Sequence, residues 1–486
     1  MLFNSIHFLI FFPIVVLLYF STPHKWRWLL LLSASYYFYM CWKPEYAILL
    51  AFTTIVDYAS GYMMGRIQGL DDVLVRKRRR KYLVMSLVSN LGVLFTFKYF
   101  NFFNNSLVDW LPKMGVPFEG THFDLLLPVG ISFYTFQSIA YVVDVYYGKV
   151  PSERNIGIYA LFSSFWPQLV AGPIERAGHI LPQFREKHIW DWERVSDGLK
   201  QMCYGLFKKV VVADTLAVIV NEVYTRPERH SGLTLLVATY FFAFQIYCDF
   251  SGYSHIAIGA AKVMGFDLMK NFNRPYLATS VKEFWKRWHI SLSTWFMSYV
   301  YIPLGGNRKG PTRTHVNLLI VFLVSGLWHG ANWTYVVWGG LNGVYLVASQ
   351  LLAPARHRLG VLFGLDSRPG LAKWVNILVT FHLVLITWVF FRASDLSSAF
   401  AILGRIARDA VLLRDLRLTV DTQNAFLAGC LLLFIFTINV MQERAPGNRL
   451  VFPSNRVLRY TMYALFGNLF FLLGNFDIMQ FIYFQF

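Results

Sequence analysis

The segments KEFWKRWHISLSTWF (Lys282–Phe296), YIPLGGNRKG (Tyr301–Gly310) and SGLWHGANW (Ser325–Trp333) give the clearest indications of fold and chemistry in this chain. They combine a basic helix with an aromatic face, a glycine-rich turn, and a histidine within a long apolar run. His289 and His329 thereby lie 40 positions apart in a chain that is otherwise rich in apolar residues. An imidazole in hydrocarbon is costly unless it faces a protein-lined or watery cavity, so both histidines are candidate functional residues.

The composition predicts an all-α, multi-pass membrane protein. Of the 486 residues, 56% are hydrophobic and 15% are charged, whereas soluble domains are about 25% charged. The apolar stretches lie at 6–20, 27–41, 45–64, 82–103, 125–147, 156–171, 197–220, 233–261, 314–327, 331–352, 373–392, 423–441 and 458–485. Several are shorter than the ~20 residues that span a bilayer, so we expect about eleven to thirteen membrane segments, some of them tilted, broken or re-entrant.

The basic residues indicate the orientation in the membrane. The formal charge of +18 is concentrated beside apolar segments. One basic region lies near residues 66–81, which include RKRRRK, and another lies near 262–313, which contains nine Lys or Arg residues and only two acidic residues. Such regions lie on the cytoplasmic side, which makes topology a better explanation than nucleic-acid binding. The loop Thr22–Arg27 is also basic, and the loop Asn104–Asp124 is mainly acidic. We therefore expect the N-terminus on the extracytoplasmic side.

No soluble domain, repeat, disulfide framework or metal site is expected, so residues 1–486 are interpreted as a single membrane domain. The first apolar segment lacks the basic start and the cleavage site of a secretory signal, which favours a retained helix. Pro and Gly interrupt the apolar runs at Leu127–Gln137 and Phe165–Arg176. Broken backbone at membrane depth is tolerated only beside protein or a water-filled cavity, so these interruptions indicate an internal chamber.

The segment Lys282–Phe296 has the spacing of one amphipathic helix at the membrane interface. Its cations, Lys282, Lys286 and Arg287, should face the cytosol. The aromatic and apolar positions on the other side are Phe284, Trp285, Trp288, His289, Leu292, Trp295, Phe296 and Tyr299.

His329 lies at a predicted break between two apolar segments, flanked by glycines. A buried, neutral imidazole suits general-base chemistry, here removal of a proton from a hydroxyl that attacks an acyl thioester. The alternative is a packing histidine bonded to a carbonyl. For His289, which lies among tryptophans, cavity lining or a structural bond is a strong alternative to a chemical role.

Asp249, in QIYCDFSGYSHIAIG (Gln245–Gly259), must be paired or neutral in an apolar segment. Ser251, Tyr253 and His255 are its candidate partners, and the cluster is equally consistent with a buried network that holds helices together.

Motifs for nucleotide hydrolysis, zinc proteases and serine hydrolases are absent from the sequence.

At these residues the chain resembles the membrane-bound O-acyltransferase family, in its bacterial alginate and polysaccharide O-acetyltransferase branch. The motifs occur in family order between Leu127 and Ala393. They are LPVGISFYTFQSIAYVVDVYYG, QLVAGPIER, GLFKKVVVAD, QIYCDFSGYSHIAIG, FWKRWHISLSTWF, YIPLGGNR, SGLWHGANW and WVFFRA.

The resemblance implies a ring of tilted helices around a central chamber, with funnels from both faces meeting at an essential histidine, here His329, and with His289 as the second family histidine. It further implies an acetyl donor, acetyl-CoA, on the cytoplasmic side of a bacterial inner membrane, an exopolysaccharide acceptor, and separate periplasmic or extracellular SGNH-type acetyltransferases as partners. We expect no bound cofactor. The expected chamber residues are Asp249, Trp328, Asn332, Trp288 and Tyr253, and the expected basic rim on the donor side is Lys282, Lys286, Arg287 and Arg308.

Two alternatives stay open. The D-alanyl transfer branch shares the histidines and the thioester donor but uses an acidic carrier protein instead of free CoA. A transporter for a polar solute would belong to a different class, and it would need coupling ions or inverted repeats, which the sequence does not reveal.

Overall fold

The computed structural model describes residues 1–69, 71–123, 126–170, 172–411, 413–445, 455–475 and 481–482. These residues form helices joined by turns and loops, and they contain no β-strand, which confirms the predicted all-α class. Asp124 of the acidic loop and Ala171 of the QLVAGPIER motif lie outside the described residues. The helices form two compact units, and the single domain over 1–486 stays a prediction.

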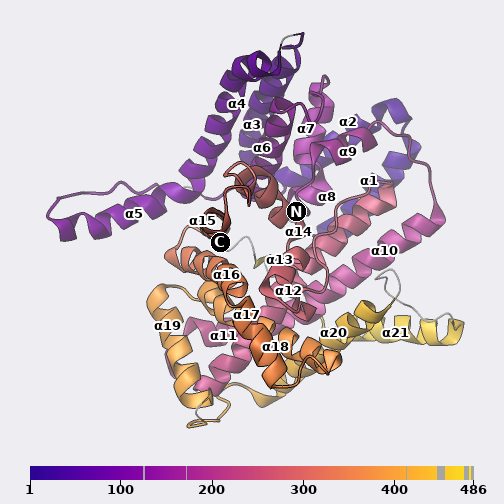
Figure 1. Cartoon of the computed structure of the whole chain (residues 1–486). Helices are drawn as coiled ribbons and strands as arrows, with labels where there is room; N and C mark the ends of the chain where they lie inside the picture. The colour runs from indigo at the N-terminus through magenta and orange to yellow at the C-terminus, as the bar shows by residue number, and fades with distance from the viewer. Residues whose placement is uncertain are drawn as a thin grey trace. The chain divides into compact units, whose positions relative to one another are not determined.

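The first unit comprises Met1–Cys203 and Tyr253–Lys270. Its helices are α1 (Ile6–Ser21), α2 (His24–Met40), α3 (Tyr46–Gly65), α4 (Asp72–Leu94), α5 (Phe100–Trp110), α6 (Ile131–Tyr146), α7 (Ile156–Ser164), α8 (Trp166–Leu169), α9 (Ala177–Gln183) and most of α10 (Trp192–Leu206). Within this unit α3, α4 and α6 lie side by side (Figure 1). Side-chain caps begin several of its helices; for example, the Asn155 side chain accepts hydrogen bonds from the first backbone amides of α7.

The second unit comprises Tyr204–Gly252 and Asn271–Phe486. Its helices are α11 (Asp214–Thr225), most of α12 (Gly232–Met264), α13 (Val281–Arg287), α14 (Ile290–Phe296), α15 (Pro311–His329), α16 (Trp333–Leu351), α17 (Ala353–Leu362), α18 (Pro369–Arg392), α19 (Leu396–Arg405), α20 (Thr422–Arg444) and α21 (Arg456–Leu473). Short π-helical segments extend several helices, at Phe95–Tyr99, Phe207–Ala213, Met297–Tyr301 and Ile406–Val411.

Five helical stretches among the described residues are long and apolar enough to cross a membrane, or six if the bent pair α16 and α17 counts as one span. These two helices meet at 65°. The continuous stretch Asp72–Met114 is 43 residues long, while α1 has only 16. The predicted eleven to thirteen segments would therefore have to include shorter helices, and that larger number stays a prediction.

The predicted interruptions in the first unit are confirmed. Gly130 has a positive φ of 75° and precedes α6, and Phe165 separates α7 from α8 with a non-helical ψ of 109°. A Cβ atom on Gly130 would lie 2.7 Å from the carbonyl oxygen of Leu169. The two broken segments therefore pack against each other, and only glycine fits the first of them.

The predicted break around His329 is also confirmed, because α15 ends at His329 and α16 begins at Trp333. The two helices pack against each other as a hairpin. A Cβ atom on Gly326 would lie 3.3 Å from the Cα atom of Gly339. The missing side chains let the backbones approach closely, which is a common way for membrane helices to pack. The hairpin holds His329 at its closed end.

The prediction of one continuous helix over Lys282–Phe296 is wrong. Helix α13 ends at Arg287, and His289 adopts a left-handed conformation (φ 43°) before α14. The cause is a neighbouring segment: the amide of Ile290 donates to the carbonyl of Asn271, and the amide of Asn273 donates to the carbonyl of Arg287. The predicted apolar and basic faces are still present in spite of this break. The apolar positions named above are buried, except for the half-buried Tyr299, and Lys282 and Lys286 are exposed.

Candidate functional site

His329 is enclosed by aromatic rings. Its side chain is 3% exposed, and its ring meets those of Trp328 and Trp338 edge to face, with ring centroids 4.8 Å apart in both cases. Phe391 of α18 lies 5.6 Å away. These rings surround the imidazole with apolar groups.

His289 lies in the same aromatic cluster as His329. It is fully buried, and its ring centroid is 4.6 Å from that of Phe250 and 6.2 Å from that of Trp328. Trp328 therefore contacts both histidine rings. The structure thus brings the two predicted catalytic residues against one indole, although they are 40 positions apart in the sequence.

Asn271 orients His289, although no motif in the sequence pointed to this asparagine. The Asn271 side-chain oxygen lies 3.1 Å from Nδ1 of His289, and it accepts hydrogen bonds from the Ser291 amide and hydroxyl at 3.3 and 2.9 Å. His289 lies outside the helices that are long enough to span a membrane. Burial of the imidazole lowers the pKa of His289 to about 3. Its imidazole is therefore neutral at physiological pH.

Asp249 is paired, but with partners other than those predicted. Its carboxylate lies 3.0 Å from Nζ of Lys209 and accepts a hydrogen bond of 2.8 Å from the amide of Ile482. Lys209 also binds Asp214 at 2.7 Å, and all three charged side chains are buried. The GLFKKVVVAD motif contains Lys209 and Asp214. The buried network that was an alternative for Asp249 is therefore present, with a lysine at its centre rather than Ser251, Tyr253 or His255.

The other predicted chamber residues have different surroundings. Trp288 belongs to the aromatic cluster, 5.1 Å from both Phe272 and Trp388 between ring centroids. Asn332 caps α16 by accepting a hydrogen bond from the Thr334 amide, and it donates to the carbonyl of Ser394. Tyr253 belongs to the first unit, where it donates to the Asn4 side chain at 3.3 Å.

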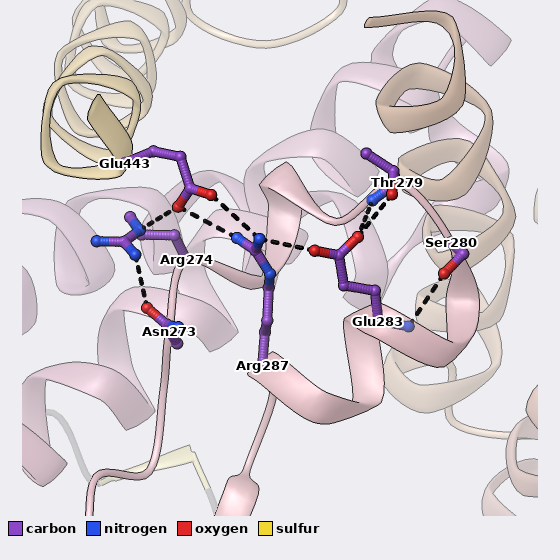
Figure 2. Close-up of polar contacts among 7 residues, drawn as sticks. All are labelled: Asn273, Arg274, Thr279, Ser280, Glu283, Arg287 and Glu443. Atoms are coloured by element: carbon purple, nitrogen blue, oxygen red, sulfur yellow. Dashed lines mark hydrogen bonds and ion pairs between the residues drawn. The ribbon is translucent and has the colours of Figure 1, made fainter. Parts of the chain in front are cut away.

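Three members of the predicted basic rim, Lys282, Lys286 and Arg308, are exposed, and the fourth, Arg287, is bound in an ion-pair network. Figure 2 shows Arg287 between Glu283 and Glu443, at 2.7 and 3.1 Å. The prediction that Arg287 presents its charge to the cytosol is therefore wrong. Two acidic side chains neutralise it, one of them from a helix 156 positions away in sequence.

Glu443, near the end of α20, joins two arginines in this network. Arg274, whose side chain is 6% exposed, binds Glu443 at 2.7 Å (Figure 2). Arg274 also donates to Asn273, and Glu283 accepts from the amide and hydroxyl of Thr279. The network therefore links α20 to α13 and to the segment that precedes α13. Backbone hydrogen bonds between that segment and the end of α13 form the break at His289.

Glu443→Gln is expected to lower the free energy of unfolding by about 1–3 kcal/mol, because it leaves Arg274 buried without its carboxylate. The measurement is the thermal unfolding midpoint in detergent. Asp415→Asn is the matched control, since it breaks the exposed pair between Asp415 and Arg417 and should change the midpoint little. Equal midpoints for Glu443→Gln and the control would contradict a stabilising role for the network.

The family model described as MBOAT, membrane-bound O-acyltransferase family, matches residues 154–391, a range that contains both histidines of the aromatic cluster.

The similar proteins include several acyltransferases. The probable alginate O-acetylase AlgI of Pseudomonas aeruginosa is 41% identical over 403 residues, covering 82% of the chain and 73% of the relative. The peptidoglycan O-acetyltransferase of Helicobacter pylori is 35% identical, covering 77% of the chain and 72% of the relative. The teichoic acid D-alanyltransferase of Streptococcus thermophilus is 28% identical, covering 58% of the chain and 72% of the relative.

Proposed function

Because the chain belongs to the membrane-bound O-acyltransferase family, we propose that it takes acetyl from a cytoplasmic thioester and transfers it across the membrane for O-acetylation of an exopolysaccharide. The protein is a multi-pass membrane O-acyltransferase. The high similarity to alginate O-acetylases supports alginate or a similar glycan as the acceptor. Acetyl-CoA is the proposed donor, and it is a substrate rather than a resident cofactor.

The proposal is carried by the contact of both buried histidines with Trp328. In the proposed reaction His329 accepts the proton of a hydroxyl whose oxygen attacks the carbonyl carbon of the acetyl thioester. A C–O bond forms, the C–S bond breaks, and the proton passes from His329 to the departing thiolate. His289 contacts the same indole and is proposed to bind and polarise a reacting group.

The proposed architecture is a ring of tilted and broken helices around a chamber that opens toward both faces of a bacterial inner membrane. Its support is the set of broken segments, at Gly130, at Phe165 and between His329 and Trp333. Irregular backbone in a membrane protein is tolerated where it borders protein or a cavity.

The donor is proposed to enter on the cytoplasmic side, past the exposed cations Lys282, Lys286 and Arg308, which suit the phosphates of CoA. The N-terminus then lies on the extracytoplasmic side. Periplasmic or extracellular SGNH-type acetyltransferases are the proposed partners, and they would pass the acetyl group to the polymer.

A second candidate is D-alanyl transfer from an acidic carrier protein to an envelope polymer. The similarity to the teichoic acid D-alanyltransferase of Streptococcus thermophilus favours it. Both candidates use a thioester donor and an alcohol acceptor, so the geometry around His329 suits either, and the acyl group must be identified directly.

The test compares cells with and without the gene after feeding radiolabelled acetate or radiolabelled D-alanine. The expected result is that deletion removes acetate label from the extracellular glycan and leaves D-alanine incorporation unchanged. Mass analysis of the purified glycan then identifies the acetylated polymer. Loss of D-alanine label instead would establish the second candidate, and unchanged incorporation of both labels would overturn the proposal.

A further inference from the structure

Asn271 lies 18 positions before His289, the residue at the break between α13 and α14, and its side chain is fully buried. Its carbonyl oxygen Oδ1 is within hydrogen-bond distance of three groups. These groups are Nδ1 of His289, the hydroxyl of Ser291 and the backbone amide of Ser291. One acceptor atom therefore has three contacts, one with the residue at the break and two with Ser291 of α14.

The contact with the Ser291 amide settles which end of the Asn271 side chain faces His289. A backbone N–H can only donate a hydrogen bond, so the atom that it meets must be the carbonyl oxygen and not the NH₂ group. An amide oxygen can only accept. The nitrogen of His289 on the same oxygen must therefore carry a hydrogen, which means that Nδ1 is protonated.

A neutral imidazole carries one hydrogen, so protonation of Nδ1 leaves a lone pair on Nε2. The nitrogen that can accept a hydrogen bond or a proton is thereby determined by the residue that binds the other nitrogen. The backbone carbonyl of Asn271 also accepts from the Ile290 amide and so holds the main chain of the turn where His289 has φ 43°. The side chain of Asn271 therefore contacts the imidazole, and its backbone holds the turn that carries this imidazole.

We propose that Asn271 is a positioning residue that selects the Nδ1–H tautomer of His289 and so presents Nε2 as an acceptor to a reacting group. This inference deepens the proposed function and rests on it for the role of the presented nitrogen. The tautomer itself follows from the contacts of Asn271 alone, and it can be measured without any assay of acyl transfer.

The first experiment reads the tautomer by solid-state NMR of the full-length protein in lipid, labelled with nitrogen-15 in its 12 histidines. His289→Phe assigns the signals of His289 by their loss. The wild type is expected to show a protonated Nδ1 and an unprotonated Nε2 at this residue. A protonated Nε2 in the wild type would overturn the proposal.

Three variants separate positioning from packing. Asn271→Asp keeps an acceptor oxygen and should retain the Nδ1–H tautomer, while Asn271→Leu has a similar size, lacks the acceptor and should lose it. Ser291→Ala is the matched control, because it removes a hydroxyl from the same oxygen but keeps the backbone amide. A retained Nδ1–H tautomer in Asn271→Leu would also overturn the proposal.

The second experiment measures kinetics with acetyl-CoA as the donor. Asn271→Leu is expected to lower kcat by about 10–100-fold with little change in KM for acetyl-CoA, since it misdirects a reacting group without touching the donor. Asn271→Asp and Ser291→Ala should retain most of the activity. Equal kcat in Asn271→Leu and Ser291→Ala, with the tautomer changed only in the former, would overturn the role in the reaction. If the wild type has the expected tautomer but transfers no acetyl, the proposed function fails and the assignment of the tautomer stands.

Discussion

His329→Ala is expected to slow acetyl transfer by about 10²–10⁴-fold, because it removes the proposed general base while the thioester still binds on the donor side. The imidazole packs against Trp328, Trp338 and Phe391, so water that enters the space left by alanine would be a poorly oriented substitute. The measurement is the initial rate of label transfer from acetyl-CoA in lipid vesicles that contain the purified protein. KM for acetyl-CoA should change little.

Two further variants make this result specific. His329→Gln retains polarity and much of the volume but cannot act as a base at neutral pH, so it should be as inactive as the alanine variant. His315 lies on the same helix but away from the aromatic cluster, so His315→Ala should leave the rate unchanged. Normal transfer by a folded His329→Ala variant would remove the proposed catalytic role.

Lys209→Met should have the largest effect on stability, lowering the free energy of unfolding by about 3–5 kcal/mol. The ammonium group of Lys209 lies between the carboxylates of Asp214 and Asp249, and its removal leaves two buried acids without their common counter-ion. Methionine has a similar volume and is apolar, so the loss reflects charge more than packing. The expected observation is a much lower unfolding midpoint in detergent and a low yield of folded protein.

The matched control is Lys200→Met, which breaks an exposed pair with Asp197 and should leave the midpoint almost unchanged. The combined variant Lys209→Met, Asp214→Leu and Asp249→Leu should recover part of the lost stability, since apolar replacements of a whole buried ionic network are often tolerated. A Lys209→Met protein as stable as the Lys200→Met control would contradict a stabilising role for the buried ion pairs.

Several features could be predicted from the sequence because their causes are local. The all-α class follows from apolar stretches too long for soluble domains, and the interruptions at Gly130 and Phe165 follow from Pro and Gly within those stretches. The end of α15 at His329 follows from the glycine after it. The two histidines were identified because ionisable groups are rare in apolar runs. Each of these features depends on the preference of a residue for a backbone conformation or for an apolar environment, which can be judged from its neighbours in the sequence.

Tertiary structure decided which groups meet. The helix around His289 breaks because backbone and side-chain groups of Asn271, 18 positions earlier, form hydrogen bonds with it. Asp249 is paired with Lys209 of an earlier segment, and Arg287 is neutralised by Glu443 from a distant helix. Helical periodicity assigns a residue to a face but does not determine which distant side chain will pack against that face. The partners of these buried charged and polar groups therefore became defined only when the chain folded.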